Sequence, residues 1–266
     1  MNDLLIAAIL SVVEGITEFL PVSSSGHLIV AGELLNFTGA RAETFEIVIQ
    51  LGAILAVAVI YWRRFLGLFF PRRRGGFSGA RGIWLLILTT FPACVAGLLL
   101  HSLIKNYLFG PATVAFGLVA GAVFMILTEK LKGKPHCATL DEITPKMALV
   151  VGLCQCAALW PGFSRSASTI MGGMLMGAKR IVAAEYSFIA AVPIMLAASG
   201  YALYKSWNIL TAADLPFFGV GLAGAFLSAL CAARAFIALM GRVTLVPFAV
   251  YRLLLAPLVY FFLSSH

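Results

Sequence analysis

Long apolar stretches alternate with short polar loops along most of this chain. A helix that crosses a membrane needs roughly 20 predominantly apolar residues, with about 17 as a lower limit. Six stretches meet or approach this length: 46–62, 83–103, 112–128, 186–204, 217–240 and 246–263. We therefore expect an all-α integral membrane protein with six transmembrane helices.

Two further apolar regions are each interrupted near their middle. Residues 4–35 are broken by Pro21 and a run of serines that ends in glycine. Residues 147–178 are broken by Pro161, the glycine after it and a second serine-rich run. Each interruption leaves two apolar arms that are too short to cross a bilayer alone. The pattern predicts two re-entrant helical hairpins, each of which enters and leaves the membrane on one side.

Charge in the loops predicts the orientation of these elements. The loop at 63–82 contains six arginines and no acidic residue, so the positive-inside rule places it in the cytoplasm. Counting spans from this loop places 36–45 and the first hairpin on the outer side, and the second hairpin on the cytoplasmic side. The net charge of +8 gathers in such loops, and we therefore read it as a sign of topology rather than of nucleic-acid binding.

Composition agrees with lipid as the main solvent. The chain is 61% hydrophobic and only 11% charged, whereas a soluble domain carries about 25% charged residues. The five cysteines show neither a disulfide framework nor the spacing of a structural zinc site. Gly117-x-x-x-Gly121 is typical of close helix packing rather than of chemistry. We expect a single transmembrane domain over residues 1–266.

A weak internal repeat relates the two interrupted regions. Three polar pairs coincide when the chain is shifted by 141 residues: Glu14 with Gln155, Ser23 with Ser164, and Ser25 with Ser166. The approximate halves, 1–128 and 147–266, would each contribute one hairpin and three spans in opposite orientations. Inverted-topology repeats of this kind also occur in secondary transporters, so architecture alone does not separate an enzyme from a transporter.

The first interruption concentrates polar groups that can act chemically. Glu14 and Glu18 are four residues apart and share one helical face, where two carboxylates require a cation, a proton or an arginine. The alternative is that both lie hydrated at the membrane interface. A turn rich in serine follows and leads to His27. Its N–H groups, at the start of a helix, suit a phosphate, and this role is compatible with helix capping by the serines.

The second interruption carries a cation. Arg165 lies between Ser164 and Ser166, with Thr169 one turn further on. A guanidinium among apolar arms is costly, and its planar fork favours phosphate or carboxylate. The alternative role is a structural ion pair with a glutamate of the first interruption. Together the two regions supply a cation, candidate nucleophiles, a general acid or base, and carboxylates for a metal.

These motifs resemble the signatures of the bacterial undecaprenyl-diphosphate phosphatases of the bacitracin-resistance type. The matching segments run through nearly the whole chain: Glu14-x-x-x-Glu18, Pro21-Val-Ser-Ser-Ser-Gly-His27, Gln50-Leu-Gly-Ala-Ile-Leu, Pro161-Gly-Phe-Ser-Arg-Ser-x-x-Thr169 and Gly172-Gly-Met-Leu-Met-Gly177. Ser25 stands where some relatives have threonine, and it keeps the hydroxyl. The resemblance implies recycling of the undecaprenyl carrier lipid for cell-wall synthesis in the bacterial plasma membrane. It also implies a divalent cation, Mg²⁺ or Ca²⁺, and a site open to the periplasm or the outside.

On these grounds we assign roles to residues of both interruptions. The catalytic set is Glu18, Ser24, His27 and Arg165. The substrate-binding set is Ser23, Ser25, Gly26, Ser164, Ser166 and Thr169, and the metal-binding set is Glu14 and Glu18. Three nucleophiles stay open: Ser24 with His27 or Glu18 accepting its proton, His27 directly, or a metal-bound water.

One other function fits much of the same pattern. A polyprenyl-phosphate transporter or flippase would bind phosphate without hydrolysis, but it would not need a nucleophile beside a base. The expected partners are a polyprenyl diphosphate substrate and membrane lipids, with no nucleic acid. The sequence is also compatible with a homodimer.

Overall fold

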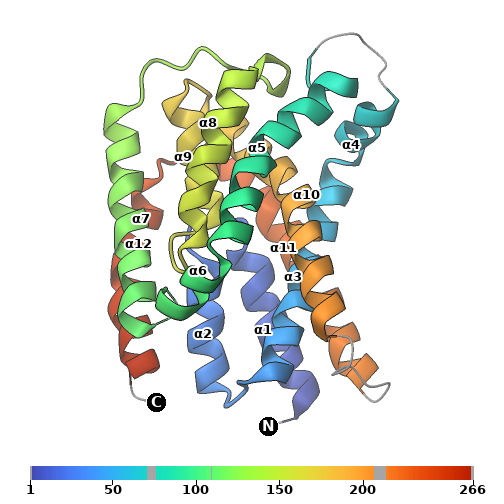
Figure 1. Ribbon diagram of the computed structural model, residues 1–266, viewed down its shortest axis with the longest axis vertical. Coiled ribbons are helices and arrows are strands. Elements are labelled where there is room, and N and C mark those ends of the chain that lie inside the picture. The colour runs from blue at the N-terminus through green and yellow to red at the C-terminus, as the bar shows by residue number, and fades with distance from the viewer. Residues whose placement is uncertain (1, 71–75, 109, 207–213, 265–266) are drawn as a thin grey trace.

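The structure is a computed structural model that describes residues 2–70, 76–108, 110–206 and 214–264. Every regular element in this described part is helical (Figure 1). The helices are α1 (Asp3–Thr17), α2 (Ser24–Leu34), α3 (Ala40–Ile60), α4 (Trp62–Phe69), α5 (Gly79–Leu99), α6 (His101–Tyr107), α7 (Pro111–Leu131), η1 (Leu140–Glu142), α8 (Pro145–Gln155), η2 (Cys156–Leu159), α9 (Arg165–Leu175), α10 (Arg180–Ser206), α11 (Leu215–Met240) and α12 (Val246–Ser264).

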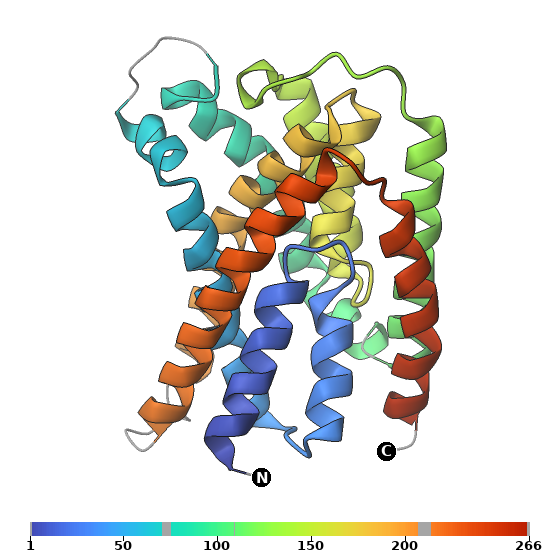
Figure 2. The ribbon, with the colours of Figure 1, turned by 180° about the vertical axis from the view of Figure 1, so that it is seen from behind.

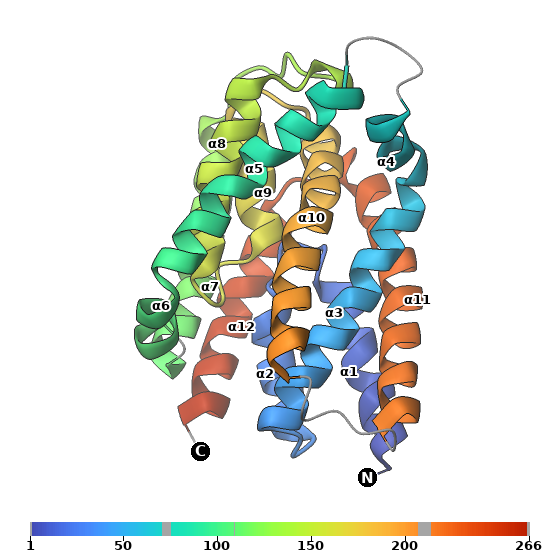
Figure 3. The same cartoon turned by 45° about the vertical axis from the view of Figure 1, so that its right-hand side comes forward.

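Five of these helices, α3, α5, α7, α10 and α11, are long and apolar enough to cross a membrane. The sixth expected span, 246–263, corresponds to α12, whose apolar part is shorter. α10 packs between α3 and α5 (Figure 3). The chain is thus an all-helical, multi-pass membrane protein.

Several element boundaries differ from those that the apolar pattern predicts. The expected span at 83–103 ends at Leu99, where the chain turns at Leu100 into the short helix α6 although the apolar run continues. α10 begins at Arg180, six residues before the expected start at 186, because its first turns carry polar side chains that a count of apolar residues omits. The apolar pattern did not predict α4, which places arginines beside exposed aromatic side chains.

The two interrupted regions form helix–turn–helix pairs that start from opposite ends of the molecule. α1 and α2 extend from the end where the two chain termini lie, and α8 and α9 extend from the end that carries α4 (Figure 1). The turn of each pair lies near mid-height, and the two turns lie close together (Figure 2). Ser166 Oγ donates a hydrogen bond of 2.8 Å to the carbonyl oxygen of Leu20, which joins the two turns directly.

The two turns share an unusual backbone. Ser23 and Ser164 have φ values of 72° and 76°, in the left-handed region that side chains other than glycine rarely occupy. Each serine caps the helix that follows, because its Oγ accepts a hydrogen bond from the N–H group three residues on, in Gly26 and Ala167 respectively. These two serines are one of the pairs that the shift of 141 residues predicts. The same strained backbone conformation therefore occurs in both turns, at the place where they meet.

At the end of the molecule that carries α4, one largely buried carboxylate joins three segments of the chain. Glu129, near the end of α7, accepts two hydrogen bonds of 2.8 Å from the guanidinium of Arg180. It also pairs with Lys132 and accepts a 2.8 Å hydrogen bond from the N–H group of Leu245. The side chain therefore links α7, α10 and the segment before α12, which limits relative movement of these helices at that end.

Candidate active site

A cavity of about 180 Å³ lies where the two turns meet. The first turn, α3 and the second turn all contribute to its lining: Glu18, Ser23, Ser24, Ser25, Gln50, Ala158, Trp160, Pro161, Gly162, Ser164 and Arg165. α2 and α9 both begin at this cavity, so two helix N-termini face one small polar space. Such a place favours a negatively charged group.

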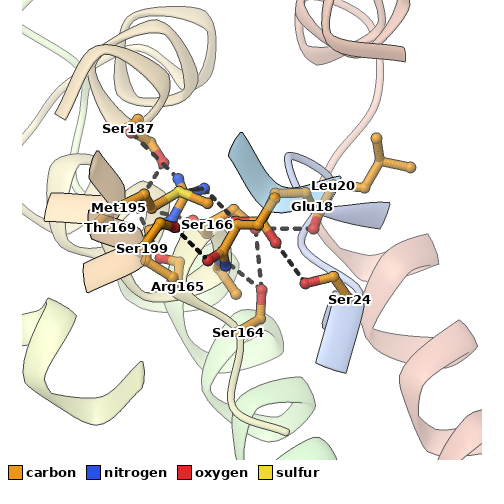
Figure 4. A network of polar contacts seen from close by, with 12 residues as sticks. Glu18, Leu20, Ser24, Ser164, Arg165, Ser166, Thr169, Ser187, Met195 and Ser199 are labelled. Atoms are coloured by element: carbon orange, nitrogen blue, oxygen red, sulfur yellow. Dashed lines mark hydrogen bonds and ion pairs between the residues drawn. The ribbon is translucent and has the colours of Figure 1, made fainter. Parts of the chain in front are cut away.

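Glu18 connects the two turns at the centre of the site. Its Oε1 accepts a 2.9 Å hydrogen bond from Nη2 of Arg165, and its Oε2 accepts a 2.5 Å hydrogen bond from Oγ of Ser24 (Figure 4). The three side chains come from positions up to 147 residues apart and include one carboxylate, one hydroxyl and one guanidinium. A hydroxyl paired with a carboxylate beside a cation is an arrangement that can support nucleophilic catalysis on a phosphate.

Arg165 has partners on several sides. Besides Glu18, its guanidinium lies 3.4 Å from the carbonyl oxygen of Ser187, 3.3 Å from the sulfur of Met195, and 5.5 Å from the centre of the Phe19 ring. The ion pair that the sequence offered as an alternative role is therefore present. The arginine also lines the cavity, so pairing and ligand binding are compatible.

The three serines of the first turn differ in their surroundings. Ser23 is buried, and its side chain caps α2. Ser24 alone among them hydrogen-bonds to the carboxylate of Glu18, within the part of the chain that the structure describes. Ser25 is exposed and lines the cavity. Ser24 is therefore the hydroxyl best placed to lose its proton to a neighbouring base.

The hydroxyl residues of the second turn lie at two depths. Ser164 lines the cavity, and its Oγ lies 3.0 Å from Oγ of Ser166. Ser166 is buried and bonds to Leu20, while Thr169 is buried and lies 2.6 Å from Oγ of Ser187. Ser166 and Thr169 are outside the cavity lining, so in this arrangement they hold the turn from behind.

His27 points away from the cavity lining and toward α12. Its Nδ1 lies 2.8 Å from the carbonyl oxygen of Ser23, and its Nε2 lies 2.6 Å from the hydroxyl of Tyr251. Because a carbonyl oxygen only accepts, Nδ1 donates to Ser23, and the hydroxyl of Tyr251 is the partner of Nε2. The two rings also stack, with centroids 5.5 Å apart. The histidine would have to leave Tyr251 before it could act on a ligand.

The two predicted metal ligands differ in their relation to the cavity. Glu18 lines the cavity, whereas Glu14 is buried one helical turn earlier and lies outside the lining. Oε2 of Glu14 has no hydrogen-bond partner among the described residues, and the same holds for Oε1 of Gln155, its counterpart in the shift of 141 residues. No cluster of three histidine, cysteine or acidic residues occurs in the described ranges.

The oxygen atoms at the cavity nevertheless suit a hard cation that is shared with a ligand. Mg²⁺ and Ca²⁺ bind carboxylate, carbonyl, hydroxyl and phosphate oxygens, and Mg²⁺ uses few protein ligands beside phosphates. Glu18 supplies a carboxylate, Gln50 an amide oxygen and the serines of the first turn hydroxyls. The donor set fits such an ion at Glu18. Glu14, one helical turn earlier and outside the lining, would contribute its negative charge without lining the cavity.

Sequence reasoning gave no site role to two polar residues near the site, of which Gln50 entered only as the first residue of a matching segment. Gln50 lines the cavity from α3, and its Oε1 accepts a 3.2 Å hydrogen bond from Oγ of Ser199. Its signal was present, since an amide inside an apolar span is costly and usually has a purpose. Tyr251 gave no comparable signal, because a tyrosine in an apolar helix is common near a membrane interface.

The fold and the cavity together define a class: a multi-pass membrane protein whose polar, phosphate-suited site forms between two interrupted helix pairs. Comparison with known proteins defines the family. A family model described as bacitracin resistance protein BacA matches residues 7–258, and the chain belongs to this family. The resemblance that the motifs predicted is thereby confirmed.

Curated relatives match this chain over its full length. A protein named undecaprenyl-diphosphatase from Desulfovibrio desulfuricans is 65% identical over 100% of both chains. A protein with the same name from Nitratidesulfovibrio vulgaris is 62% identical over 99% of this chain and 100% of the relative. Another from Solidesulfovibrio magneticus is 55% identical over 98% of this chain and 99% of the relative.

Proposed function

We propose that this protein hydrolyses undecaprenyl diphosphate to undecaprenyl phosphate and inorganic phosphate, and so recycles the lipid carrier for cell-wall synthesis. The observation that carries the proposal is the contact of Glu18 with both Ser24 and Arg165 at the cavity. The names of the full-length relatives support it. A protein that only binds and moves a lipid phosphate has no need for a hydroxyl paired with a carboxylate beside that phosphate.

In the proposed mechanism, Arg165 binds the terminal phosphate and offsets the charge that develops on its oxygens. Ser24 Oγ attacks the terminal phosphorus while Glu18 takes the hydroxyl proton. The bond from this phosphorus to the bridging oxygen breaks, and undecaprenyl phosphate leaves. Water then attacks the phosphorus of the phosphoserine, the bond from this phosphorus to Ser24 Oγ breaks, and Glu18 returns its proton to Oγ. Inorganic phosphate, which keeps the protons of the water, is released.

Glu18 would also hold a divalent cation, with Glu14 one turn behind it. When bound, such a cation supplies positive charge to the phosphate oxygens. Glu18 is the carboxylate that lines the cavity, and its two oxygens already bond to groups from both turns. The remaining task of this chain is to orient the diphosphate between the N-termini of α2 and α9.

We propose further that six helices span the membrane and that the two helix–turn–helix pairs are re-entrant hairpins of an inverted repeat. The packing partners support this arrangement. α1 packs on α11 and α8 packs on α5, while α2 packs on α12 and α9 packs on α7. When the halves 1–128 and 147–266 are exchanged, the contact of α1 with α11 becomes that of α8 with α5, and the contact of α2 with α12 becomes that of α9 with α7. An internal two-fold relation requires this.

The orientation follows from the positive loops and places the first turn's side of the site toward the outside of a bacterial plasma membrane. Cysteines introduced at Thr38 and Lys134, both exposed and at opposite ends of the molecule, test it in a background without the native cysteines. An impermeant thiol reagent on intact spheroplasts should label position 38 and leave position 134 unlabelled. Labelling of position 134 alone would reverse the orientation.

Release of inorganic phosphate from a polyprenyl diphosphate by the purified protein in detergent tests the proposed function. We expect steady release that depends on the amount of protein. A preparation that instead moves polyprenyl phosphate across a liposome membrane, and releases no phosphate, would establish the transporter and overturn the hydrolase.

A further inference from the structure

A fully buried arginine lies behind the second turn of the site. Arg252 of α12 has 0% of its surface exposed. Its Nη2 donates to the carbonyl oxygens of Gly162 at 2.7 Å and Gly117 at 3.2 Å, and its Nη1 lies 3.6 Å from the sulfur of Met125. Within the described ranges, no ion pair includes this arginine, and its Nε has no hydrogen-bond partner.

A charge in this environment is costly for the fold. Removing a guanidinium from water is repaid only by good partners, and apolar side chains of similar volume often fill such positions without loss of stability. The partners here are two carbonyl groups and a thioether, with no carboxylate among the described contacts. Packing alone therefore gives no reason for an arginine at this position.

The carbonyl groups that Arg252 binds connect it to the catalytic cavity. Gly162 lines the cavity and precedes Ser164 and Arg165 in the second turn. Its φ of +89° places it in the left-handed region, and a Cβ atom here would lie 2.3 Å from the carbonyl oxygen of Val114. The second turn thus lies directly on α7 and is held by the guanidinium from α12.

Two glycines of α7 make room for this contact. A Cβ atom on Gly117 would lie 2.4 Å from the carbonyl oxygen of Pro161, and one on Gly121 would lie 2.2 Å from Nη2 of Arg252. The spacing Gly117-x-x-x-Gly121 therefore permits close packing, as the sequence predicted, and the groups that approach are the second turn and the arginine. The hydrogen bond from Arg252 to Gly162 is possible because no side chain projects from this surface of α7.

We propose that Arg252 is a positioning residue: through the carbonyl group of Gly162 it fixes the second turn so that Ser164 and Arg165 face Glu18 across the cavity. The inference rests on the proposed function, because it concerns the same site. Arg252 does not itself line the cavity, and it acts through the carbonyl group of Gly162, which does. A displacement of about 1 Å in such an element can lower a rate by roughly 10²-fold.

The replacement Arg252→Met separates positioning from folding. It keeps an unbranched apolar stem, shorter than that of arginine, and removes a buried charge, so the melting temperature should stay near that of the wild type or rise. The value of kcat should fall by roughly 10- to 100-fold with KM little changed. Arg252→Lys should recover part of kcat, because an ammonium can reach one carbonyl but not replace the fork. Arg234→Met is the matched control, since Arg234 is an exposed arginine of α11, the helix that precedes α12 in the chain.

A second variant reaches the same contact from the other side. Gly121→Ala should displace the guanidinium without altering the arginine, and its Cβ atom would also lie 2.8 Å from the carbonyl oxygen of Phe163 in the second turn, so it should lower kcat at least as much as Arg252→Met. Gly219→Ala in α11 is the control, because a Cβ atom there meets nothing within 4 Å. The double variant Gly121→Ala with Arg252→Met should be no slower than the slower single variant, since both remove one interaction.

Hydrogen–deuterium exchange supplies a readout that does not require turnover. Arg252→Met should raise exchange in peptides that cover 160–168 and leave the first turn, 18–26, at its wild-type rate. If the wild type is active and Arg252→Met keeps both the wild-type kcat and the wild-type exchange, the inference about Arg252 is overturned and the proposed function stands. Parallel loss of melting temperature and activity, with exchange raised in both turns, would also overturn it and leave a structural role. A wild type that releases no phosphate would instead remove the proposed function, and the exchange result would still decide the role of Arg252.

Discussion

The two turns of the site have the same backbone but opposite chemistry and different supports. Ser23 and Ser164 occupy the same left-handed region and cap their helices alike. The first turn carries the carboxylate and the paired hydroxyl, and the second carries the guanidinium. The first is joined to α12 by the hydrogen bond between His27 and Tyr251, whose tyrosine is 45% exposed. The second is joined to α12 by Arg252, which is fully buried.

The difference shows how two turns of the same backbone can form an asymmetric site. Both turns direct a helix N-terminus at the cavity, and their side chains differ in chemistry. Each turn alone would carry an uncompensated charge, because Glu18 and Arg165 neutralise each other across the interface. The buried attachment belongs to the turn with Arg165, and the exposed attachment belongs to the turn with the proposed nucleophile, Ser24.

The largest effect should come from the first turn's hydroxyl. Ser24→Ala removes the proposed nucleophile and should lower kcat by several orders of magnitude, as loss of a serine nucleophile does. Ser25→Ala, a neighbouring serine that also lines the cavity, should have a much smaller effect. Single-turnover trapping with labelled substrate should yield acid-stable phosphoserine. An acid-labile adduct, or substantial turnover by Ser24→Ala, would transfer the role to His27 or to water.

Removal of divalent cations should come next. Chelation with EDTA should lower turnover by ~10³-fold or more, since a Lewis acid contributes several kcal/mol, and added Mg²⁺ or Ca²⁺ should restore it. If the cation belongs to the first turn, Glu18→Gln should raise the concentration of ion required. Ser164→Ala in the second turn should leave that concentration unchanged. Turnover that is indifferent to EDTA would assign Glu18 to proton transfer alone.

The next largest loss of activity should come from removing the guanidinium of the second turn. Arg165→Ala removes a preorganised donor to the phosphate and should lower kcat by ~10²–10³-fold while the protein still inserts and folds. Arg165→Lys should recover little, because a point charge does not replace a planar fork. Phosphate release with purified variants, beside a melting curve for each, measures both effects. A fully active Arg165→Ala would remove the second turn from the chemistry.

The smallest effect should come from the exposed attachment of the first turn. Tyr251→Phe keeps the ring that stacks on His27 and removes only one hydrogen bond, worth about 1 kcal/mol. The value of kcat should therefore change by less than ~10-fold. A loss as large as that in Ser24→Ala would mean that Tyr251 holds a catalytic histidine, and the two attachments would then be equally important.

Much of this arrangement could be predicted from local sequence patterns. The lengths of apolar runs indicated the long helices, and Pro21 and Pro161 with the serines after them located both turns. The contact of Arg165 with a glutamate followed from the cost of a lone charge in apolar surroundings. Each of these signals lies within a short segment, and for that reason a single sequence was sufficient.

The supports of the site could not be predicted in the same way. Arg252 binds a carbonyl group 90 residues away, and no side chain near it in the sequence indicates that partner. His27 belongs to the first turn's motif, yet its contact with Tyr251 places it outside the cavity lining. Glu14 shares a helical face with Glu18, but only the packing of α1 shows that it lies outside the lining. Such facts depend on how distant helices pack and are absent from local periodicity.

A double-mutant cycle across the two turns tests the central claim most directly, namely that they build one catalytic site. The rates of phosphate release by wild type, Glu18→Gln, Arg165→Ala and the double variant are measured under identical conditions. Because residues of one unit are strongly non-additive, the double variant should be no slower than the slower single variant. Losses that multiply, each turn contributing independently, would contradict a shared site at the contact between Glu18 and Arg165.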